Sequence, residues 1–172
     1  MAPEAAPSAA VKRTIHVNVP IDKAFKVFTE RMAAWWPATH HIAKEPFVEI
    51  IVEPRPGGRW YERDAKGNSC DWGQVLVWEP PRKLVATWQL QPDFKFSPDL
   101  SLASEVAMEF IAEGPEATRL EFEHRLLERH GAGWQELRKA VDAPGGWTAV
   151  LAKYVEAFKA NQERIGSCNS KL

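Results

Sequence analysis

Glu62 and His124 are the two side chains best suited to chemistry in this sequence. A carboxylate near an imidazole can move protons as an acid/base couple, or it can orient the carbonyl group of a ligand. The alternative is structural: the two groups hydrogen-bond to each other, or to the backbone, and close a polar gap in the core. We favour the structural role and assign no residue as a catalyst, because a sequence does not show whether two side chains converge.

Other reactive side chains have simpler interpretations. His40 and His41 are adjacent and could ligate a metal, but no Cys, Asp or third His stands at a ligand spacing, so we expect no metal site. Arg55 and Arg59 flank two glycines, which could form a phosphate nest, although a hairpin turn with solvated arginines is simpler. Cys70 is expected to be a buried packing thiol. No Walker, Rossmann or nucleophile-elbow motif is present, and we expect no cofactor.

The composition is that of one ordinary globular domain, with 172 residues, 45% of them apolar and 26% charged. A net charge of −1 provides no strong field, so we expect neither nucleic acid nor a membrane as a partner. No stretch approaches about 20 continuous apolar residues, as a membrane-spanning helix would need. The two cysteines lie far apart, which favours a reduced, cytoplasmic setting. Eight tryptophans are unusual, and they either fill a core or line a ligand cavity.

The apolar pattern predicts a sheet followed by a long helix. Alternation and turn residues predict strands at 11–19, 47–53, 59–63, 70–78, 83–90, 103–112 and 118–126, with short helices at 21–28, 30–37 and 133–141. One face of a final helix carries Trp147, Val150, Leu151, Tyr154, Val155 and Phe158. This order predicts an α+β fold with an antiparallel sheet and its helices gathered on one side. A helix laid across a curved sheet can leave a pocket between them.

We expect a single domain at residues 11–163, a disordered tail at 1–10 and a frayed tail at 164–172. Residues 1–10 lack both the basic start and the apolar run of a signal peptide. Exposed strand edges permit pairing but nothing specifies it, so a monomer and a homodimer both remain open.

Several short motifs are similar to those of a known family. They are VPI at 19–21, FKVF at 25–28, EPRPGGRW at 53–60, GQVL at 73–76, PPRKL at 80–84, Trp88, SEV at 104–106, EFEH at 121–124 and GW at 146–147. On these motifs the chain resembles the START/SRPBCC superfamily over about residues 11–160. Within it, the chain is most similar to the activator of heat-shock-protein ATPase homologue-like family.

The resemblance implies a helix-grip fold, in which a curved antiparallel sheet wraps around a long C-terminal helix, with two short helices after the first strand. It also implies that the concave face of the sheet and the final helix enclose a cavity. The side chains expected to line it are Trp36, His40, His41, Trp60, Glu62, Trp72, Trp88, Met108, Phe110, Phe122, His124, Trp147, Leu151 and Tyr154.

Three functions are consistent with this resemblance. The first is a non-enzymatic module that holds a small apolar molecule, such as a lipid or polyketide, between sheet and helix. The second is a cyclase or hydrolase that acts on an apolar carbonyl compound through Glu62 and His124. The third is a chaperone ATPase co-regulator. We expect it least, because the activators carry a separate chaperone-binding region, for which the ten residues before the first strand leave no room.

Overall fold

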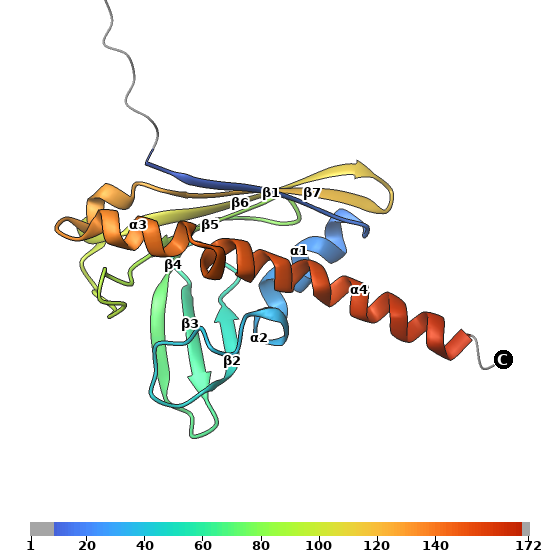
Figure 1. Cartoon of the computed structure of the whole chain (residues 1–172), viewed down its shortest axis with the longest axis horizontal. Coiled ribbons are helices and arrows are strands. Elements are labelled where there is room, and N and C mark those ends of the chain that lie inside the picture. The colour runs from blue at the N-terminus through green and yellow to red at the C-terminus, as the bar shows by residue number, and fades with distance from the viewer. Residues whose placement is uncertain (1–8, 170–172) are drawn as a thin grey trace, which may run out of the picture.

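The computed structural model describes residues 9–169, with side chains as far as residue 159, and its centre is one bent seven-stranded antiparallel sheet (Figure 1). The spatial order of the strands is β1-β7-β6-β5-β4-β3-β2. From β2 to β7, each strand therefore pairs with the next strand in sequence, and β1 pairs antiparallel with β7. The strands are β1 (Val11–Val17), β2 (Phe47–Val52), β3 (Arg59–Asp64), β4 (Ser69–Glu79), β5 (Lys83–Trp88), β6 (Ser104–Gly114) and β7 (Ala117–Arg125).

Irregular pairing bends the sheet. The register shifts between Trp60 and Tyr61 in the β3–β4 pair, and between Val75 and Val77 in the β4–β5 pair. Such bulges increase local twist and turn a strand out of the plane. At Gly73 the next strand approaches so closely that an added Cβ would lie 1.9 Å from the carbonyl oxygen of Thr87. In Figure 1, β2 and β3 accordingly turn away from the layer of β1, β6 and β7.

Within residues 9–169, four α-helices and three short helical turns accompany the sheet. They are α1 (Ile21–Glu30), α2 (Met32–Trp35), α3 (Trp134–Asp142) and α4 (Ala149–Asn169), with the 3₁₀ turns η1 (Leu100–Leu102) and η2 (Leu127–His130) and the π-helical turn η3 (Pro144–Thr148). The long helix α4 runs along the bend of the sheet (Figure 1). In residues 9–169, no helix is both long and apolar enough to cross a membrane.

Aromatic rings fill most of the space between α4 and the sheet. The ring of Phe28 in α1 lies 5.1 Å from that of Tyr154 in α4 and 5.7 Å from that of Phe110 in β6. The hydroxyl of Tyr154 donates a hydrogen bond of 2.7 Å to the carbonyl oxygen of Ala24, which ties α4 to α1. The buried face of α4 follows the predicted stripe, so Tyr154 faces the interior and is 0% exposed. Trp147, in the preceding turn η3, is also buried, at 4% exposure.

The predicted α+β helix-grip fold is confirmed, and the differences lie at the ends of elements. The final helix was expected to contain Trp147, but this residue lies in η3, because Gly146 has a non-helical ψ of −129°. The tails predicted at 1–10 and 164–172 fall partly outside the described residues. In the described parts of these tails, the carbonyl oxygen of Ala9 accepts a hydrogen bond from Arg138, and α4 continues to Asn169.

Candidate functional site

A pocket of about 540 Å³ opens where η3 and the start of α4 face the bent sheet. We call it the tryptophan pocket, because four indole rings form much of its wall. This volume is in the range of cavities that hold drug-sized molecules. The lining residues are Trp36, Thr39, His40, His41, Ile42, Trp72, Trp88, Leu90, Asp93, Phe94, Lys95, Ala140, Val141, Gly145, Gly146, Trp147 and Val150.

The four indoles of the tryptophan pocket come from separate elements and pack on one another. Trp72 in β4 and Trp88 in β5 face inward from neighbouring strands, and Trp36 follows α2. The ring of Trp36 lies 5.0 Å from that of Trp72 and 5.9 Å from that of Trp147. The rings of Trp88 and Trp147 are 5.4 Å apart. Edge-to-face and tilted contacts of this kind stabilise aromatic clusters, so the wall is formed before any ligand binds.

Trp147 is positioned by the tight turn η3. A Cβ at Gly146 would lie 2.2 Å from the carbonyl oxygen of Val141, so only glycine allows η3 to approach α3 this closely. The neighbouring Gly145 is different, because a Cβ there would meet nothing within 4 Å. Gly145 lines the pocket, and its carbonyl oxygen accepts a 2.8 Å hydrogen bond from Nε2 of His40. Both glycines line the pocket, but only Gly146 is packed closely against α3.

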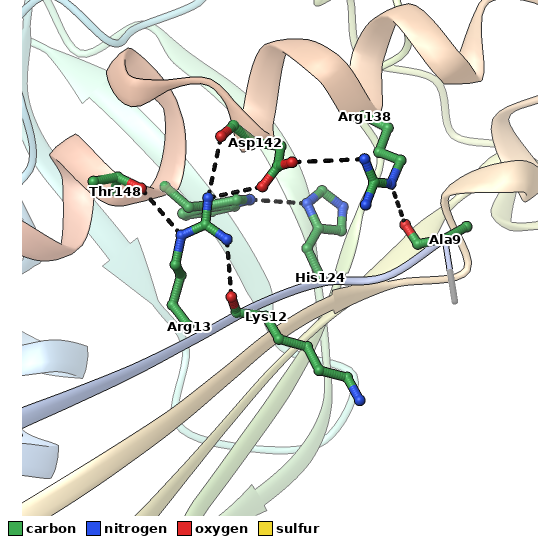
Figure 2. Close-up of polar contacts among 8 residues, drawn as sticks. Ala9, Lys12, Arg13, His124, Arg138, Asp142 and Thr148 are labelled. Carbon is green, nitrogen blue, oxygen red and sulfur yellow. Dashed lines mark hydrogen bonds and ion pairs between the residues drawn. The ribbon is translucent and has the colours of Figure 1, made fainter. Parts of the chain in front are cut away.

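Arg13 of β1 braces both ends of η3 (Figure 2). Its guanidinium group donates to Oδ1 of Asp142, at the end of α3, over 2.8 Å, and to Oγ1 of Thr148 over 3.0 Å. Arg138 lies on the other side of the same carboxylate, with its Nη1 3.6 Å from Oδ2 of Asp142. The edge strand of the sheet thus holds the turn that carries Trp147.

Behind the pocket wall, a chain of hydrogen bonds begins at Trp147. Its Nε1 donates to Nδ1 of His124 over 3.0 Å, and Nε2 of His124 lies 2.7 Å from Oγ of Ser104. The same Oγ lies 2.7 Å from Nε2 of His130, whose Nδ1 is 3.2 Å from Oε1 of Gln91. The chain therefore runs from η3 through β7, β6 and η2 to the residues that follow β5.

The indole at one end gives this chain a single direction. An indole N–H can only donate, so Nδ1 of His124 is an acceptor and its proton is on Nε2. This proton points to Ser104, whose hydroxyl then donates to Nε2 of His130, and the proton of His130 is on Nδ1, facing Gln91. Every donor has an acceptor when both imidazoles are neutral.

Burial favours the neutral imidazoles that this chain requires. Desolvation and, to a smaller extent, repulsion of like charge by the nearby His130 together lower the pKa of His124 from 6.5 to about 3. Desolvation also lowers the pKa of His130, from 6.5 to about 4. Leu126, with a φ of 60°, turns the backbone between the two histidines and brings His130 back toward β6.

Glu62 belongs to a separate polar cluster. Its Oε1 accepts hydrogen bonds from the backbone N–H of Ile42 at 2.7 Å and from Nε1 of Trp72 at 2.9 Å. Its Oε2 is buried without a hydrogen-bond partner in the described part of the chain. Ile42 and Trp72 line the tryptophan pocket, whereas Glu62 and His124 do not. The structure therefore places the two predicted chemical groups in different networks, with no hydrogen bond between them.

Six of the fourteen side chains predicted for the cavity line the tryptophan pocket: Trp36, His40, His41, Trp72, Trp88 and Trp147. The other eight are buried but do not line it: Trp60, Glu62, Met108, Phe110, Phe122, His124, Leu151 and Tyr154. The physical reason is dense packing along α4, where large rings occupy the space that the resemblance assigned to a longer cavity. Phe122, for example, packs its ring 4.6 Å from that of Trp147.

The contribution of the connection between β5 and β6 was not predicted from the sequence. Asp93, Phe94 and Lys95 line the pocket, and Gln91 completes the hydrogen-bond chain together with Ser104, the first residue of β6. The available signal was the placement of two phenylalanines, at 94 and 96, in a loop bounded by prolines. Large aromatic side chains in a loop either pack against the rest of the protein or remain exposed, and exposed ones can mark a binding surface.

The remaining candidates have ordinary structural surroundings. Nε of Arg59 donates to Oδ1 of Asp71 over 2.9 Å, and its guanidinium lies 4.0 Å from the centre of the Tyr61 ring, so its charge is already paired. Burial, followed by nearby carboxylates, raises the pKa of the Cys70 thiol, which keeps it protonated. Among the described residues, no group of three or more His, Cys, Asp or Glu side chains is placed to hold a metal ion.

The bent antiparallel sheet and the long C-terminal helix define a helix-grip domain of the SRPBCC-like class. The chain belongs to the family described as Activator of Hsp90 ATPase homolog 1-like protein, whose family model matches residues 18–159. The family predicted from the sequence motifs is thereby confirmed. A search of curated proteins gave no match.

Solved structures share this fold. The anthrahydroquino-γ-pyrone synthase Txn09, complexed with SUM, is 36% identical, and the match covers 86% of this chain and 95% of the synthase with a TM-score of 0.61. CalC from Micromonospora echinospora, described as a self-sacrificing resistance protein, is 27% identical with a TM-score of 0.66, over 88% of this chain and 95% of CalC. Protein NE0264 from Nitrosomonas europaea is 18% identical, and the match covers 88% of this chain and 95% of NE0264 with a TM-score of 0.61. At this identity the two proteins share a fold and nothing more is inferred.

Proposed function

We propose that this protein binds a small, mainly apolar molecule in the tryptophan pocket. The observation that carries the proposal is a cavity of about 540 Å³ whose indole walls already pack against one another. An apolar molecule that enters it leaves water without requiring the wall to reorganise, which is the condition for useful affinity.

One unpaired donor in the pocket wall suggests that the ligand carries a hydrogen-bond acceptor. Nε1 of Trp88 is buried without a hydrogen-bond partner in the described residues, and Trp88 lines the pocket. A buried N–H without an acceptor is costly, and a ligand oxygen could satisfy it. The rim carries both signs of charge, with Asp93 and Lys95, so neither a cationic nor an anionic ligand is clearly favoured. A neutral, apolar molecule with a carbonyl or hydroxyl oxygen fits these features best.

The relatives support this proposal without supplying the ligand. Txn09 was solved in complex with SUM, and its name describes the synthesis of an anthrahydroquino-γ-pyrone. A ring system with several oxygens has the mixed apolar and acceptor character that the tryptophan pocket would suit. We propose the same general class for this chain and not the same compound.

Native mass spectrometry of the purified protein tests the binding function. We expect either a co-purified molecule or a one-to-one adduct with Nile red, a neutral polycyclic fluorophore. Denaturation should release the bound mass, and a Val150→Trp variant, which fills the pocket from α4, should reduce the adduct. Wild-type protein that carries no molecule and takes up no Nile red would contradict the proposal.

An enzyme of the cyclase or hydrolase type is the second candidate, and the unpartnered Oε2 of Glu62 favours it. Glu62→Gln would keep an acceptor for the N–H groups of Ile42 and Trp72 while it removes the base. If Glu62 acts in catalysis, conversion of apolar aryl ketones and esters should fall by about 10²–10⁴-fold with the fold intact. Equal activity of both forms, or no conversion by the wild type, would exclude this role.

The family name adds regulation of a chaperone ATPase as a third candidate. Three of the large apolar side chains that remain exposed in the described chain, Phe94, Phe96 and Leu100, lie on the β5–β6 connection, where a partner could contact them. A cytoplasmic location and the choice between monomer and homodimer are also proposals. Copurification with a chaperone that is lost in Leu100→Ser would support the regulatory function, and light scattering would give the oligomeric state.

A further inference from the structure

The β5–β6 connection presents Phe94 at the rim of the tryptophan pocket. Phe94 is 44% exposed and is among the residues that line the pocket. Two backbone hydrogen bonds form a tight turn: Gln91 N–H to Lys95 O at 2.9 Å and Phe94 N–H to Gln91 O at 2.7 Å. Phe94 thus lies at the tip of a closed turn beside the cavity.

The backbone at Phe94 is in a conformation that suits glycine. Among the non-glycine residues that the structure describes, only Phe94 and Leu126 have a positive φ, and that of Phe94 is 61°. A residue with a Cβ is strained there, whereas glycine is not. The exposed apolar ring adds a second unfavourable feature, since it remains in contact with water. For the free protein, phenylalanine is therefore a poor choice at this position, and strain of this kind concentrates at functional sites.

The base of the same turn is firmly held. The side chain of Gln91 donates to the carbonyl oxygens of Gln89 and Leu102, each at 3.2 Å, and accepts from Nδ1 of His130. Through Ser104 and His124, this anchor continues to Trp147 in the pocket wall. Hydrogen bonds therefore connect the base of the turn that carries Phe94 to the indole wall of the pocket.

We propose that Phe94 is a ligand-contacting residue, whose ring covers the bound molecule from the solvent side and selects for ligands with a flat ring face. The proposal rests on the proposed binding function. A ligand that contacts both the indole wall and Phe94 shields the ring from water, and this contact offsets the backbone strain. Aromatic rings stack or meet edge to face with a flat ligand, whereas a flexible aliphatic chain gains less from the ring.

Phe94→Gly separates this role from a structural one. The substitution removes the ring and the strain together, so thermal stability should stay equal or rise, while affinity for Nile red should fall at least about tenfold. Phe96→Gly is the matched control, because Phe96 is 37% exposed, has no positive φ and does not line the tryptophan pocket. In this control stability should fall and affinity should not change.

The outcomes distinguish the inference from the function on which it rests. Tighter binding of Nile red than of a fatty acid by the wild type, with the preference lost only in Phe94→Gly, would support the inference. If the wild type binds Nile red and Phe94→Gly binds it equally well, the role of Phe94 is excluded and the pocket function stands. If the wild type binds neither compound, the binding function fails and the inference fails with it.

Discussion

His124 and His130 lie on either side of one hydroxyl group, with Nε2 of each imidazole 2.7 Å from Oγ of Ser104. Because the indole of Trp147 donates to His124, the serine proton must point to His130. One directional chain therefore joins the wall of the tryptophan pocket to the base of the Phe94 turn. The chain is buried, which makes each bond in it costly to break.

Removal of the shared hydroxyl tests the chain. Ser104→Ala leaves the N–H of His124 and the acceptor nitrogen of His130 unpaired, so the free energy of unfolding should fall by about 2–4 kcal/mol. Urea unfolding measures the change. Ser101→Ala is the control, because Ser101 is exposed, and its effect should stay below about 0.5 kcal/mol. Equal effects of the two substitutions would show that the chain adds nothing to stability.

The lowered pKa values predict a loss of stability in acid. Below about pH 6.5, His124 and His130 bind protons in the unfolded chain. In the folded protein they stay neutral until the pH falls to about 3 for His124 and about 4 for His130. The stability is therefore complete above pH 6.5 and declines as the pH falls, with a slope of up to about 1.4 kcal/mol per pH unit for each histidine.

Urea unfolding between pH 6.5 and 4.5 measures this slope. His130→Gln should lower the stability at all pH values and make its pH dependence shallower. The slope of stability against pH does not depend on the pH-independent loss of stability, so the two effects of the substitution can be measured separately. A variant with the wild-type slope would contradict the buried, neutral state of His130.

The adjacent glycines of η3 should respond in opposite ways to the same substitution. Gly146→Ala places a Cβ 2.2 Å from the carbonyl oxygen of Val141, so the protein should lose at least about 2 kcal/mol or fail to fold. Gly145→Ala meets nothing within 4 Å and should change the stability by less than about 1 kcal/mol, with a gain possible from a stiffer unfolded chain. Thermal unfolding compares them. Similar midpoints for the two variants would show that η3 does not approach α3 as described.

Arg13 should matter through the turn that it braces. Arg13→Ala removes the hydrogen bonds to Asp142 and Thr148, so the stability should fall by about 1 kcal/mol, and Nile red binding should weaken as Trp147 loses its support. Arg63→Ala breaks an exposed ion pair with Glu49 between β3 and β2 and is the control. We expect it to leave both properties unchanged. If Arg13→Ala alters stability but not binding, the brace does not position the pocket wall.

The fold was predictable because its elements carry strong periodic patterns. In β7, buried and partly exposed residues alternate from Thr118 to His124, as the alternation of Leu120, Phe122 and His124 predicted. The buried face of α4 follows the 3.6-residue stripe in the same way. The extent of the cavity was not predictable, because it depends on how rings from separate elements, such as Phe28 and Phe110, divide the interior. Facing inward does not decide between filling a core and lining a pocket.

The hydrogen-bond chain also could not be predicted from local sequence patterns. Ser104 and His130 are separated by 26 residues, and they meet only because the backbone turns at Leu126. Glu62 and His124 stood out by residue type, but the partner of each is an indole from another element. In the described residues no hydrogen bond joins Glu62 to His124: Glu62 accepts from Ile42 N–H and from Trp72, and His124 accepts from Trp147.

The central claim is that the tryptophan pocket binds an apolar molecule. A substitution that fills the pocket with a side chain tests this claim most directly. Gly145→Phe projects a ring from a lining position with open space around its Cβ, whereas Gly114→Phe adds the same ring at a position of ordinary contact, 3.9 Å from Cβ of Ala117. Titration with Nile red should give saturable one-to-one binding to the wild type and to Gly114→Phe, and none to Gly145→Phe. Equal binding by all three proteins, or by none, would contradict the account.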